Sequence, residues 1–279
     1  SFKMDGVRCV AKCTSIGVVT LESRTGQPYF LPHITAELAW YMNEGEEWDG
    51  EIYKHGCMLQ DITSAVKRTD TQKEIDICQR KVDNAVGDED IQEAYSALGN
   101  AKSIHELRPQ LEFVMFDVIS DEPWFTRKED LKTASMRMRL NQHVRVLEYV
   151  TVYSEEEMKE QHRAAVMAGY EGIMLRNKWG YYESGKRSAD LQKYKEFMDS
   201  EFYIHDVVAD KDGLGVFVVM NTFSTNFFTV IMGTHAERLY QLNHKDEFIG
   251  KLLTVQYQSL YKGTLIPQFP CGLIIRDYE

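Results

Sequence analysis

Phe2-Lys3-Met4-Asp5-Gly6-Val7-Arg8 brings an amine, a carboxylate, a glycine and a guanidinium group together near the start of the chain. These groups suit phosphate chemistry, in which an amine can act as a nucleophile and a guanidinium group can bind oxygen anions. An Asp-Gly pair beside a strand is also a common surface turn, and taken alone this motif favours that interpretation. Partners elsewhere in the chain must therefore decide its meaning.

The length and composition indicate a globular protein with room for two domains. The chain has 279 residues, of which 43% are hydrophobic, and a formal net charge of -11. A protein that simply coats nucleic acid would be expected to be basic, so this charge argues against that class. It does not exclude an enzyme whose basic residues converge on one groove, because the local field decides the contact.

The cysteines and the hydropathy pattern indicate in which cellular compartment the protein is expected. The five cysteines are scattered and form no CxxC pair, which argues against a four-cysteine zinc module and a disulfide framework. No apolar run reaches the roughly 20 residues of a membrane span, so we expect a cytoplasmic protein without membrane contact. Ser1 is not an initiator methionine, and we expect the natural chain to begin earlier.

Residues 1–199 alternate between strand and helix signals. Residues 1–60 are rich in strands and turns, and 69–107 has the polar, near-helical spacing of two surface helices inserted between compact parts. Leu111–Ile119 is a nearly continuous apolar run typical of a buried strand. The remaining predictions are a helix over Lys128–Tyr149, a strand over Val150–Tyr153 and a helix over Glu155–Ala168 that ends at Gly169.

Residues 200–279 are dense in strands. One short helix, His235–Asn243, is predicted between the third and fourth of five strand-like runs. This pattern suits a small closed barrel such as an OB-fold, which often binds nucleic acid. The five runs are Glu201–Ala209, Gly215–Thr222, Phe227–Gly233, Leu252–Tyr257 and Cys271–Arg276.

Three further stretches carry chemistry that matches Lys3. Asp49-Gly50-Glu51 and Glu171–Arg176 each place a glutamate at a strand, and Lys193-Tyr194-Lys195 puts two amines on one strand face. Two glutamates could bind a hard divalent cation, and two lysines could hold phosphate oxygens. Each stretch alone is better explained as solvated charge, but their joint occurrence favours one phosphate-handling site.

In chain order these motifs resemble an ATP-dependent DNA ligase of the covalent nucleotidyltransferase superfamily, of the small viral or bacterial kind. The resemblance implies an α+β nucleotidyltransferase (ATP-grasp-like adenylation) domain over 1–199, with a helical insertion at 69–107, followed by an all-β OB-fold domain over 200–279. Agreement of six motifs in one order is far more specific than any single match. The matching stretches are Lys3–Arg8 (KxDGxR), Ser23–Gly26 (SRxG), Asp49–Glu51 (DGE), Phe113–Asp117 (FxxFD), Glu171–Arg176 (EGxMxR) and Lys193–Lys195 (KxK).

The resemblance implies a role for each residue of the nucleotide site. Lys3 would attack ATP and carry AMP covalently, and Lys193 and Lys195 would stabilise charge on the transferred phosphoryl group. A lysine with an ordinary pKa of about 10.4 is protonated at neutral pH and must be activated by its neighbours. Glu171 would hold Mg²⁺ or Mn²⁺, and Glu51 would contact the ribose or the metal.

The same resemblance implies how the nucleotide is held. Phe116 would stack on the adenine, and Met174 would cover its other face. Ordinary core packing is an alternative for both residues. Asp5 would support the nucleophile, and Arg8 would contribute to the nucleotide site and help at the nick phosphate.

DNA contacts are implied at three positions. Arg24 would grip the nick phosphate, while Lys186 and Arg187 would contact the DNA backbone without reading sequence. Arg276 would meet the pyrophosphate. Relatives often have a further basic residue directly after this arginine, whereas Asp277 follows it here.

The implied activity is sealing of 3′-hydroxyl/5′-phosphate nicks in duplex DNA by a monomer in the cytoplasm, or in the host cytoplasm for a viral protein. It would serve DNA repair, replication and recombination. An mRNA capping guanylyltransferase and a non-catalytic nick-binding relative are the alternatives. Capping enzymes more often begin the EGIMLR motif with an aspartate, and a mere binding protein need not keep every chemical residue.

Overall fold

The computed structural model describes residues 1–138, 142–186, 188–261 and 263–276. The chain divides into a first unit, Ser1–Lys195, and a second unit, Glu196–Glu279. The expected boundary between residues 199 and 200 falls inside strand β10, which already begins at Met198 by pairing with Tyr257. The boundary therefore lies before that strand.

The first unit is built on a six-stranded sheet within its described residues, in the order β4-β3-β2-β5-β6-β7. All neighbours are antiparallel except β6 and β7, which run parallel. In β6 the consecutive side chains of Phe113, Val114 and Met115 are all buried, as expected for a strand covered on both faces. The strands are β2 (Val7–Ser15), β3 (Val18–Glu22), β4 (Pro28–Tyr29), β5 (Glu47–Tyr53), β6 (Glu112–Val118) and β7 (Val144–Val146).

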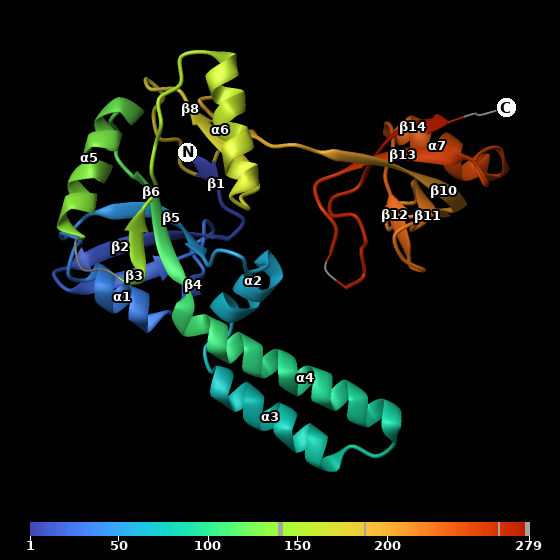
Figure 1. Cartoon of the computed structure of the whole chain (residues 1–279), viewed down its shortest axis with the longest axis horizontal. Helices are drawn as coiled ribbons and strands as arrows, with labels where there is room; N and C mark the ends of the chain where they lie inside the picture. Colours follow the sequence, from blue (N-terminus) through green and yellow to red (C-terminus); the bar gives the residue numbers. More distant parts are fainter. Residues whose placement is uncertain (139–141, 187, 262, 277–279) are drawn as a thin grey trace. The chain divides into compact units, whose positions relative to one another are not determined.

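A smaller three-stranded sheet lies beside the chain start (Figure 1) and has the order β1-β8-β9. Its strands are β1 (Phe2–Lys3), β8 (Gly172–Arg176) and β9 (Leu191–Tyr194). Lys3 lies opposite Gly172, and Met174 lies opposite Lys193. Three motifs far apart in the sequence are thus hydrogen-bonded neighbours.

Helices cover these sheets. Helices α1, α2 and α5 pack on the large sheet, and α6 packs on β8 and β1 of the small sheet. The core of this unit includes Trp48, Phe113, Ile34, Leu38 and Ile62. The helices are α1 (Pro32–Leu38), α2 (Leu59–Lys67), α3 (Thr71–Asn84), α4 (Asp88–Leu107), α5 (Trp124–Arg137) and α6 (Glu155–Met167), with a 3₁₀ turn at Arg108–Gln110.

Helices α3 and α4 occupy the stretch in which an insertion is expected. They form a hairpin that extends away from the sheets of the first unit (Figure 1). Asp70 caps α3 by accepting a 2.9 Å hydrogen bond from the Lys73 amide, and Gly87, with φ of 97°, separates the helices. A small core of Cys78, Leu98 and Ala101 joins them.

Within its described residues, the second unit is a five-stranded barrel of OB-fold topology. Its sheet has the order β12-β11-β10-β13-β14, and a parallel bridge between Ile231 and Cys271 closes it. Helix α7 begins with a capping box between Thr234 and Glu237. The elements are β10 (Met198–Ala209), β11 (Gly215–Met220), β12 (Phe227–Val230), α7 (His235–Asn243), the 3₁₀ turn Lys245–Glu247, β13 (Leu252–Tyr257) and β14 (Cys271–Arg276). The α+β domain followed by an OB-fold is confirmed.

Two local predictions were wrong. The helix expected over Lys128–Tyr149 ends at Arg137, and the strand expected over Val150–Tyr153 occurs instead at Val144–Val146. The amide of Phe113 donates to the carbonyl of His143, and β7 continues that pairing along β6. Tertiary pairing therefore overrides the helical pattern.

No helix among the described residues is long and apolar enough to cross a membrane.

Candidate active site

Lys3 belongs to a charged triad that is built from three segments and has Glu171 at its centre. Its Nζ contacts Oε2 of Glu171, while Nζ of Lys195 donates to Oε1 of the same carboxylate at 2.7 Å. Lys3 ends β1, Glu171 immediately precedes β8 and Lys195 follows β9. The structure therefore brings together the predicted nucleophile, the predicted metal ligand and one predicted phosphate-binding lysine.

Two glycines near the triad allow neighbouring segments of the backbone to pack closely. Gly172 has φ of 151°, and a Cβ atom on it would lie 2.4 Å from the Tyr194 carbonyl oxygen. A Cβ atom on Gly6 would lie 2.6 Å from the Ile52 carbonyl oxygen. Any larger residue at either position would push the strands apart, so the motif glycines have a packing role.

The triad fixes the charge of Glu171. Burial tends to raise its pKa, but hydrogen bonds from Lys195 and Lys3 outweigh burial and lower that pKa below its ordinary value. Glu51 behaves differently, since burial raises its pKa to about 8 although the charge of Lys3 opposes the shift. Asp5 lies exposed in the turn between β1 and β2.

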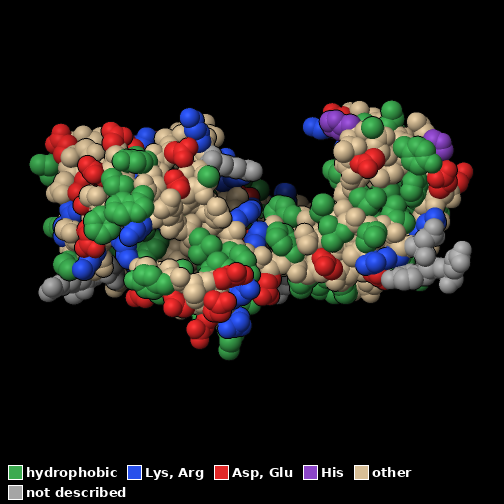
Figure 2. Space-filling view, turned by 90° about the horizontal axis from the view of Figure 1, so that it is seen from above, with side chains coloured by type: hydrophobic (Ala, Val, Ile, Leu, Met, Phe, Trp, Pro, Cys, Tyr) green, Lys and Arg blue, Asp and Glu red, His purple; other side chains and the backbone are tan. Residues whose placement is uncertain are grey.

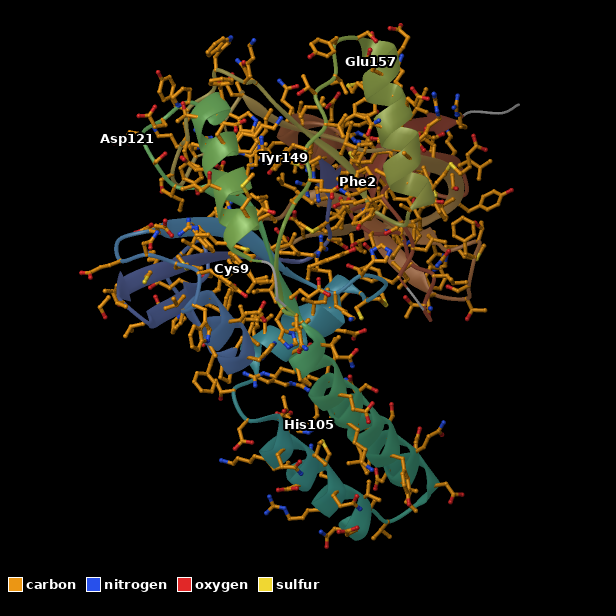
Figure 3. The ribbon with its side chains drawn as sticks, turned by 60° about the vertical axis from the view of Figure 1, so that its left-hand side comes forward. Phe2, Cys9, His105, Asp121, Tyr149 and Glu157 are labelled. Carbon is orange, nitrogen blue, oxygen red and sulfur yellow. The ribbon has the colours of Figure 1, made fainter. Side chains whose placement is uncertain are left out.

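A cleft opens beside Lys3. Phe2 and Tyr149, which are labelled in Figure 3, contribute to its wall. Its lining contains five residues predicted for the nucleotide site, which are Lys3, Arg8, Glu51, Phe116 and Met174. The other lining residues are Ser1, Met4, Leu147, Arg176 and Leu191.

The Phe116 ring lies near two cations. The guanidinium carbons of Arg8 and Arg176 lie 6.0 Å and 5.8 Å from its centroid. Phe113, three residues earlier, is fully buried in the core. Phe116 is only half-buried, so a ring surface remains at the cleft.

Arg8 is held by a carboxylate from the neighbouring strand. Its Nε and one terminal nitrogen donate to the two oxygens of Asp49 at 3.0 Å and 2.5 Å. The Tyr182 hydroxyl donates to Asp49 at 2.9 Å and accepts from Arg8 at 3.2 Å. Asp49 stands in the DGE motif without a predicted role, and Tyr182 gave no sequence signal.

A second buried network lies next to the first, and its members had no predicted roles. Asp117 accepts from Arg127 at 2.8 Å and 3.3 Å, and its Oδ2 also pairs with Arg176. The side chains of Asp117 and Arg127 are only 1% and 2% exposed. Asp117 ends the FxxFD motif and Arg176 ends the EGxMxR motif. Their positions in these motifs were the sequence signal that could have pointed to this network.

Three further predicted residues, Lys193, Arg24 and Lys186, are not among the residues that line this cleft. Lys193 is exposed on β9, Arg24 is exposed in the turn between β3 and β4, and Lys186 is exposed in the 177–190 loop. Arg187 lies outside the described residues. Arg276 belongs to the barrel, where its Nε donates to Thr254 at 3.0 Å and lies 3.4 Å from Glu201.

The donor set fits a hard divalent cation that also binds substrate. Among the described residues there is no cluster of three or more His, Cys, Asp or Glu side chains able to hold a metal. Glu51 and Glu171 nevertheless both lie within electrostatic range of Lys3. Mg²⁺ commonly uses one or two protein carboxylates together with substrate phosphates, and these two glutamates match that pattern.

The fold is that of an α+β nucleotidyltransferase domain followed by an OB-fold domain. Residues 1–195 match the family model described as an ATP dependent DNA ligase domain. The chain therefore belongs to the ATP-dependent DNA ligase family.

Known proteins similar to the chain agree with this assignment. The DNA ligase of African swine fever virus (a Warthog/Namibia isolate) is 26% identical over 287 residues, covering 95% of this chain and 60% of the viral protein. This chain thus spans about 60% of the length of that relative.

Two solved structures share the fold. A Lig E DNA ligase, described in a study of DNA binding with a minimal scaffold, has a TM-score of 0.70 at 21% identity and covers 99% of this chain and 91% of its own. A structure named Pmar-Lig_Pre has a TM-score of 0.73 at 18% identity and covers 100% of this chain and 63% of its own.

Proposed function

We propose that this chain is an ATP-dependent DNA ligase that seals 3′-hydroxyl/5′-phosphate nicks in duplex DNA through lysyl-AMP and DNA-adenylate intermediates. The observation that carries the proposal is the convergence of Lys3, Glu171 and Lys195 at one point beside a cleft. The family membership of residues 1–195 supports the same reaction class.

In the first step Nζ of Lys3 attacks the α-phosphorus of ATP. A nitrogen–phosphorus bond forms, the bond from that phosphorus to the bridging oxygen breaks, and pyrophosphate leaves. Nζ must lose a proton to attack, and its contact with Glu171 holds the amine at the cleft before reaction. Lys195 provides a second cation close to the carboxylate, where it can oppose the negative charge of the phosphoryl group.

In the later steps AMP passes from Lys3 to the 5′-phosphate of the nick. The adjacent 3′-hydroxyl then attacks that phosphorus and releases AMP. We assign the nick phosphate to Arg24 with help from Arg8, and the backbone contact to Lys186 and Arg187. Guanidinium groups can bind phosphate through paired hydrogen bonds, which supports the assignment of the arginines.

The adenine would lie against Phe116 with Met174 on its other face, because both line the cleft. We propose that Glu51 contacts the ribose or the metal, and that Asp5 supports the nucleophile from the turn. Arg276 would contact the pyrophosphate.

Glu51 and Glu171 are the residues that would hold Mg²⁺ or Mn²⁺. When bound, such an ion would neutralise phosphate charge in the transition state. The lysines and arginines of this chain would orient the phosphates in any case.

On the visible face of the first unit, acidic and basic side chains are interspersed (Figure 2). The net charge of -11 therefore does not make that face uniformly acidic, which is compatible with a local DNA contact.

Nucleotide choice tests the proposal against a capping enzyme. Purified protein is incubated with labelled ATP or GTP and a divalent cation, and the covalent adduct is measured by mass spectrometry. We expect an AMP adduct, followed by sealing of a labelled nicked duplex. Labelling from GTP alone would support the guanylyltransferase, and no adduct with any nucleotide would support a non-catalytic nick-binding relative.

Replacing Arg24 with alanine should separate the steps. Arg24 lies in an exposed turn away from the Lys3 cleft, so adenylation should remain within about twofold of wild type. Sealing should fall by about 10- to 100-fold, the scale of a lost charge-assisted hydrogen bond. Lys102→Ala, at an exposed position on the α3–α4 hairpin, is the matched control and should seal normally. If R24A impairs both steps equally, Arg24 has another role.

Glu51 should make stability depend on pH. Burial raises its pKa from 4.5 to about 8, so the folded chain keeps a proton that the unfolded chain has lost in this window. The contribution of Glu51 to stability is therefore fully present below the unfolded pKa of 4.5 and is lost as pH rises towards about 8. Glu51→Gln cannot ionise, so its unfolding midpoint relative to wild type should rise between about pH 5 and about pH 9.

The measurement for Glu51 is thermal unfolding across this pH range with a chelator present. Glu44→Gln, at an exposed position, is the control, and its difference from wild type should stay constant. Parallel curves for E51Q and wild type would contradict the expected burial of a neutral carboxyl group.

Several finer points stay predictions. We propose a cytoplasmic location, or the host cytoplasm for a viral protein, on the basis of cysteines that are free in the structure. We also propose that the protein is a monomer. We propose that it takes part in DNA repair, replication and recombination, and each of these points requires its own test.

A further inference from the structure

The Tyr182 hydroxyl occupies a bridging position between Arg8 and Asp49. It donates to Oδ2 of Asp49 at 2.9 Å and accepts from a terminal nitrogen of Arg8 at 3.2 Å. The same nitrogen of Arg8 also donates to Oδ2 of Asp49 at 2.5 Å. The three side chains therefore close a ring of hydrogen bonds around one carboxylate oxygen.

Two neighbouring strands supply the charged members of this ring. Arg8 on β2 lies opposite Glu51 on β5, and Asp49 is two residues from Glu51. Arg8 and Glu51 both line the nucleotide cleft, and Asp49 is joined to them through its hydrogen bonds with Arg8. Asp49 is 1% exposed and the Arg8 side chain is 38% exposed, so the pair joins a buried anchor to an accessible cation.

Tyr182 comes from a different part of the chain, the 177–190 loop between β8 and β9. The base of this loop is fixed to the start of α5, because the amides of Trp124 and Phe125 donate to the carbonyls of Gly180 and Lys178 at 2.8 Å and 2.9 Å. Beyond Tyr182 the loop is exposed through Lys186. Tyr182 therefore ties the loop to β2 and β5 a few residues before the segment that carries a predicted DNA contact.

A second cleft lies on this side of the ring. Arg8, Tyr182, Lys186 and Ser188 are among its lining residues. Asp49 and Tyr182 engage Nε and one terminal nitrogen of Arg8. The other terminal nitrogen is the one that can donate to a phosphate oxygen.

We infer that Tyr182 is a positioning residue for nick sealing, which holds the guanidinium group of Arg8 on Asp49 and couples it to the loop that carries Lys186. The inference rests on the proposed ligase function. It assigns to Tyr182 no contact with the reacting atoms, and it places the larger effect on the DNA-dependent steps, in which Arg8 is assigned to the nick phosphate. A smaller effect on adenylation is expected, because Arg8 also lines the nucleotide cleft.

The phenol is suited to this task across the usual range of assay conditions. Burial and the negative charge of Asp49 raise the pKa of Tyr182 above its ordinary value. The hydroxyl therefore keeps its proton and remains a donor to Asp49.

Tyr182→Phe removes only the hydroxyl and tests the inference directly. Adduct formation on Lys3 should fall by less than sealing does, while single-turnover sealing of a pre-adenylated nick should slow by about 10- to 100-fold. Tyr181→Phe is the matched control, because Tyr181 is an exposed neighbour in the same loop, and it should seal at the wild-type rate.

A double-mutant cycle distinguishes positioning from a structural role. Arg8→Lys keeps a cation but removes the guanidinium group that Tyr182 contacts. If Tyr182 acts through Arg8, Y182F should change sealing by less than about twofold in the R8K background. An equal loss in both backgrounds, or an equal loss of adduct formation and sealing, would overturn the inference.

Failure of this inference is distinguishable from failure of the proposed function. If the wild-type protein forms no adduct on Lys3, the proposed function fails. If wild type forms the adduct and seals nicks, and Y182F seals at the same rate, only the role of Tyr182 is refuted.

Discussion

Lys3→Ala should form no covalent AMP adduct when incubated with ATP and a divalent cation. The amine is the proposed nucleophile, and loss of a covalent nucleophile reduces turnover by a factor on the order of 10⁴ to 10⁶. Mass spectrometry of the intact protein measures the adduct, and peptide mapping of wild type locates it. An adduct that persists in K3A would show that the nucleophile is elsewhere.

Two controls make this result specific to the chemistry. Lys12→Ala removes a lysine of the next strand that pairs with Glu22 at 2.9 Å, and it should adenylate normally. A nicked duplex that already carries AMP on its 5′-phosphate does not require the Lys3 nucleophile. K3A should therefore still seal that substrate, whereas loss of both reactions would indicate a damaged fold.

Much of the fold could be predicted because local signals and tertiary structure agree. In the barrel, period-two alternation and turn residues place all five strands, and the helix predicted at His235–Asn243 has those same bounds in the structure. The Thr234–Glu237 capping box fixes the start of that helix locally.

Sequence reasoning failed where pairing with a distant strand decides the structure. Val144–Val146 follows a helical stretch and could extend it, but it forms a parallel pair with β6. Glu37 on α1 contributes by accepting hydrogen bonds from the amides of His143 and Val144 at 3.0 Å and 3.1 Å. Glu37 is 106 and 107 residues away from these two amides along the chain, so no local pattern reveals this contact.

The candidate site likewise has a part that local sequence motifs predict and a part that depends on how distant strands pair. Lys3, Glu171 and Lys195 belong to motifs whose spacing indicates phosphate chemistry, and the structure brings them together. The pairing of Asp49 with Asp117 depends on the register of β5 against β6, which shifts at Asp49–Gly50. A slip of one residue would turn a side chain to the other face, so the buried networks could not be derived from composition or spacing.

The buried network around Asp117 leads to the second large expected effect, a loss of stability in Asp117→Ala. Asp117 binds Arg127, which is 2% exposed, and Arg176, which is 10% exposed. Removing the carboxylate would leave two buried guanidinium groups without their counter-ion. Breaking a buried ion pair in this way costs about 3–5 kcal/mol.

Unfolding of the first unit can be followed separately from the barrel, because all four tryptophans of the chain lie within residues 1–195. Urea unfolding monitored by tryptophan fluorescence should give D117A a free energy of unfolding lower than wild type by about 3–5 kcal/mol. Asp121→Ala, at an exposed position labelled in Figure 3, is the control and should change it by no more than about 0.5 kcal/mol. A loss below about 1 kcal/mol in D117A would mean that Arg127 and Arg176 find other partners, such as the Glu122 and Phe116 carbonyl oxygens that they already contact. In that case Asp117 would not be the main support of Arg176, which lines the nucleotide cleft.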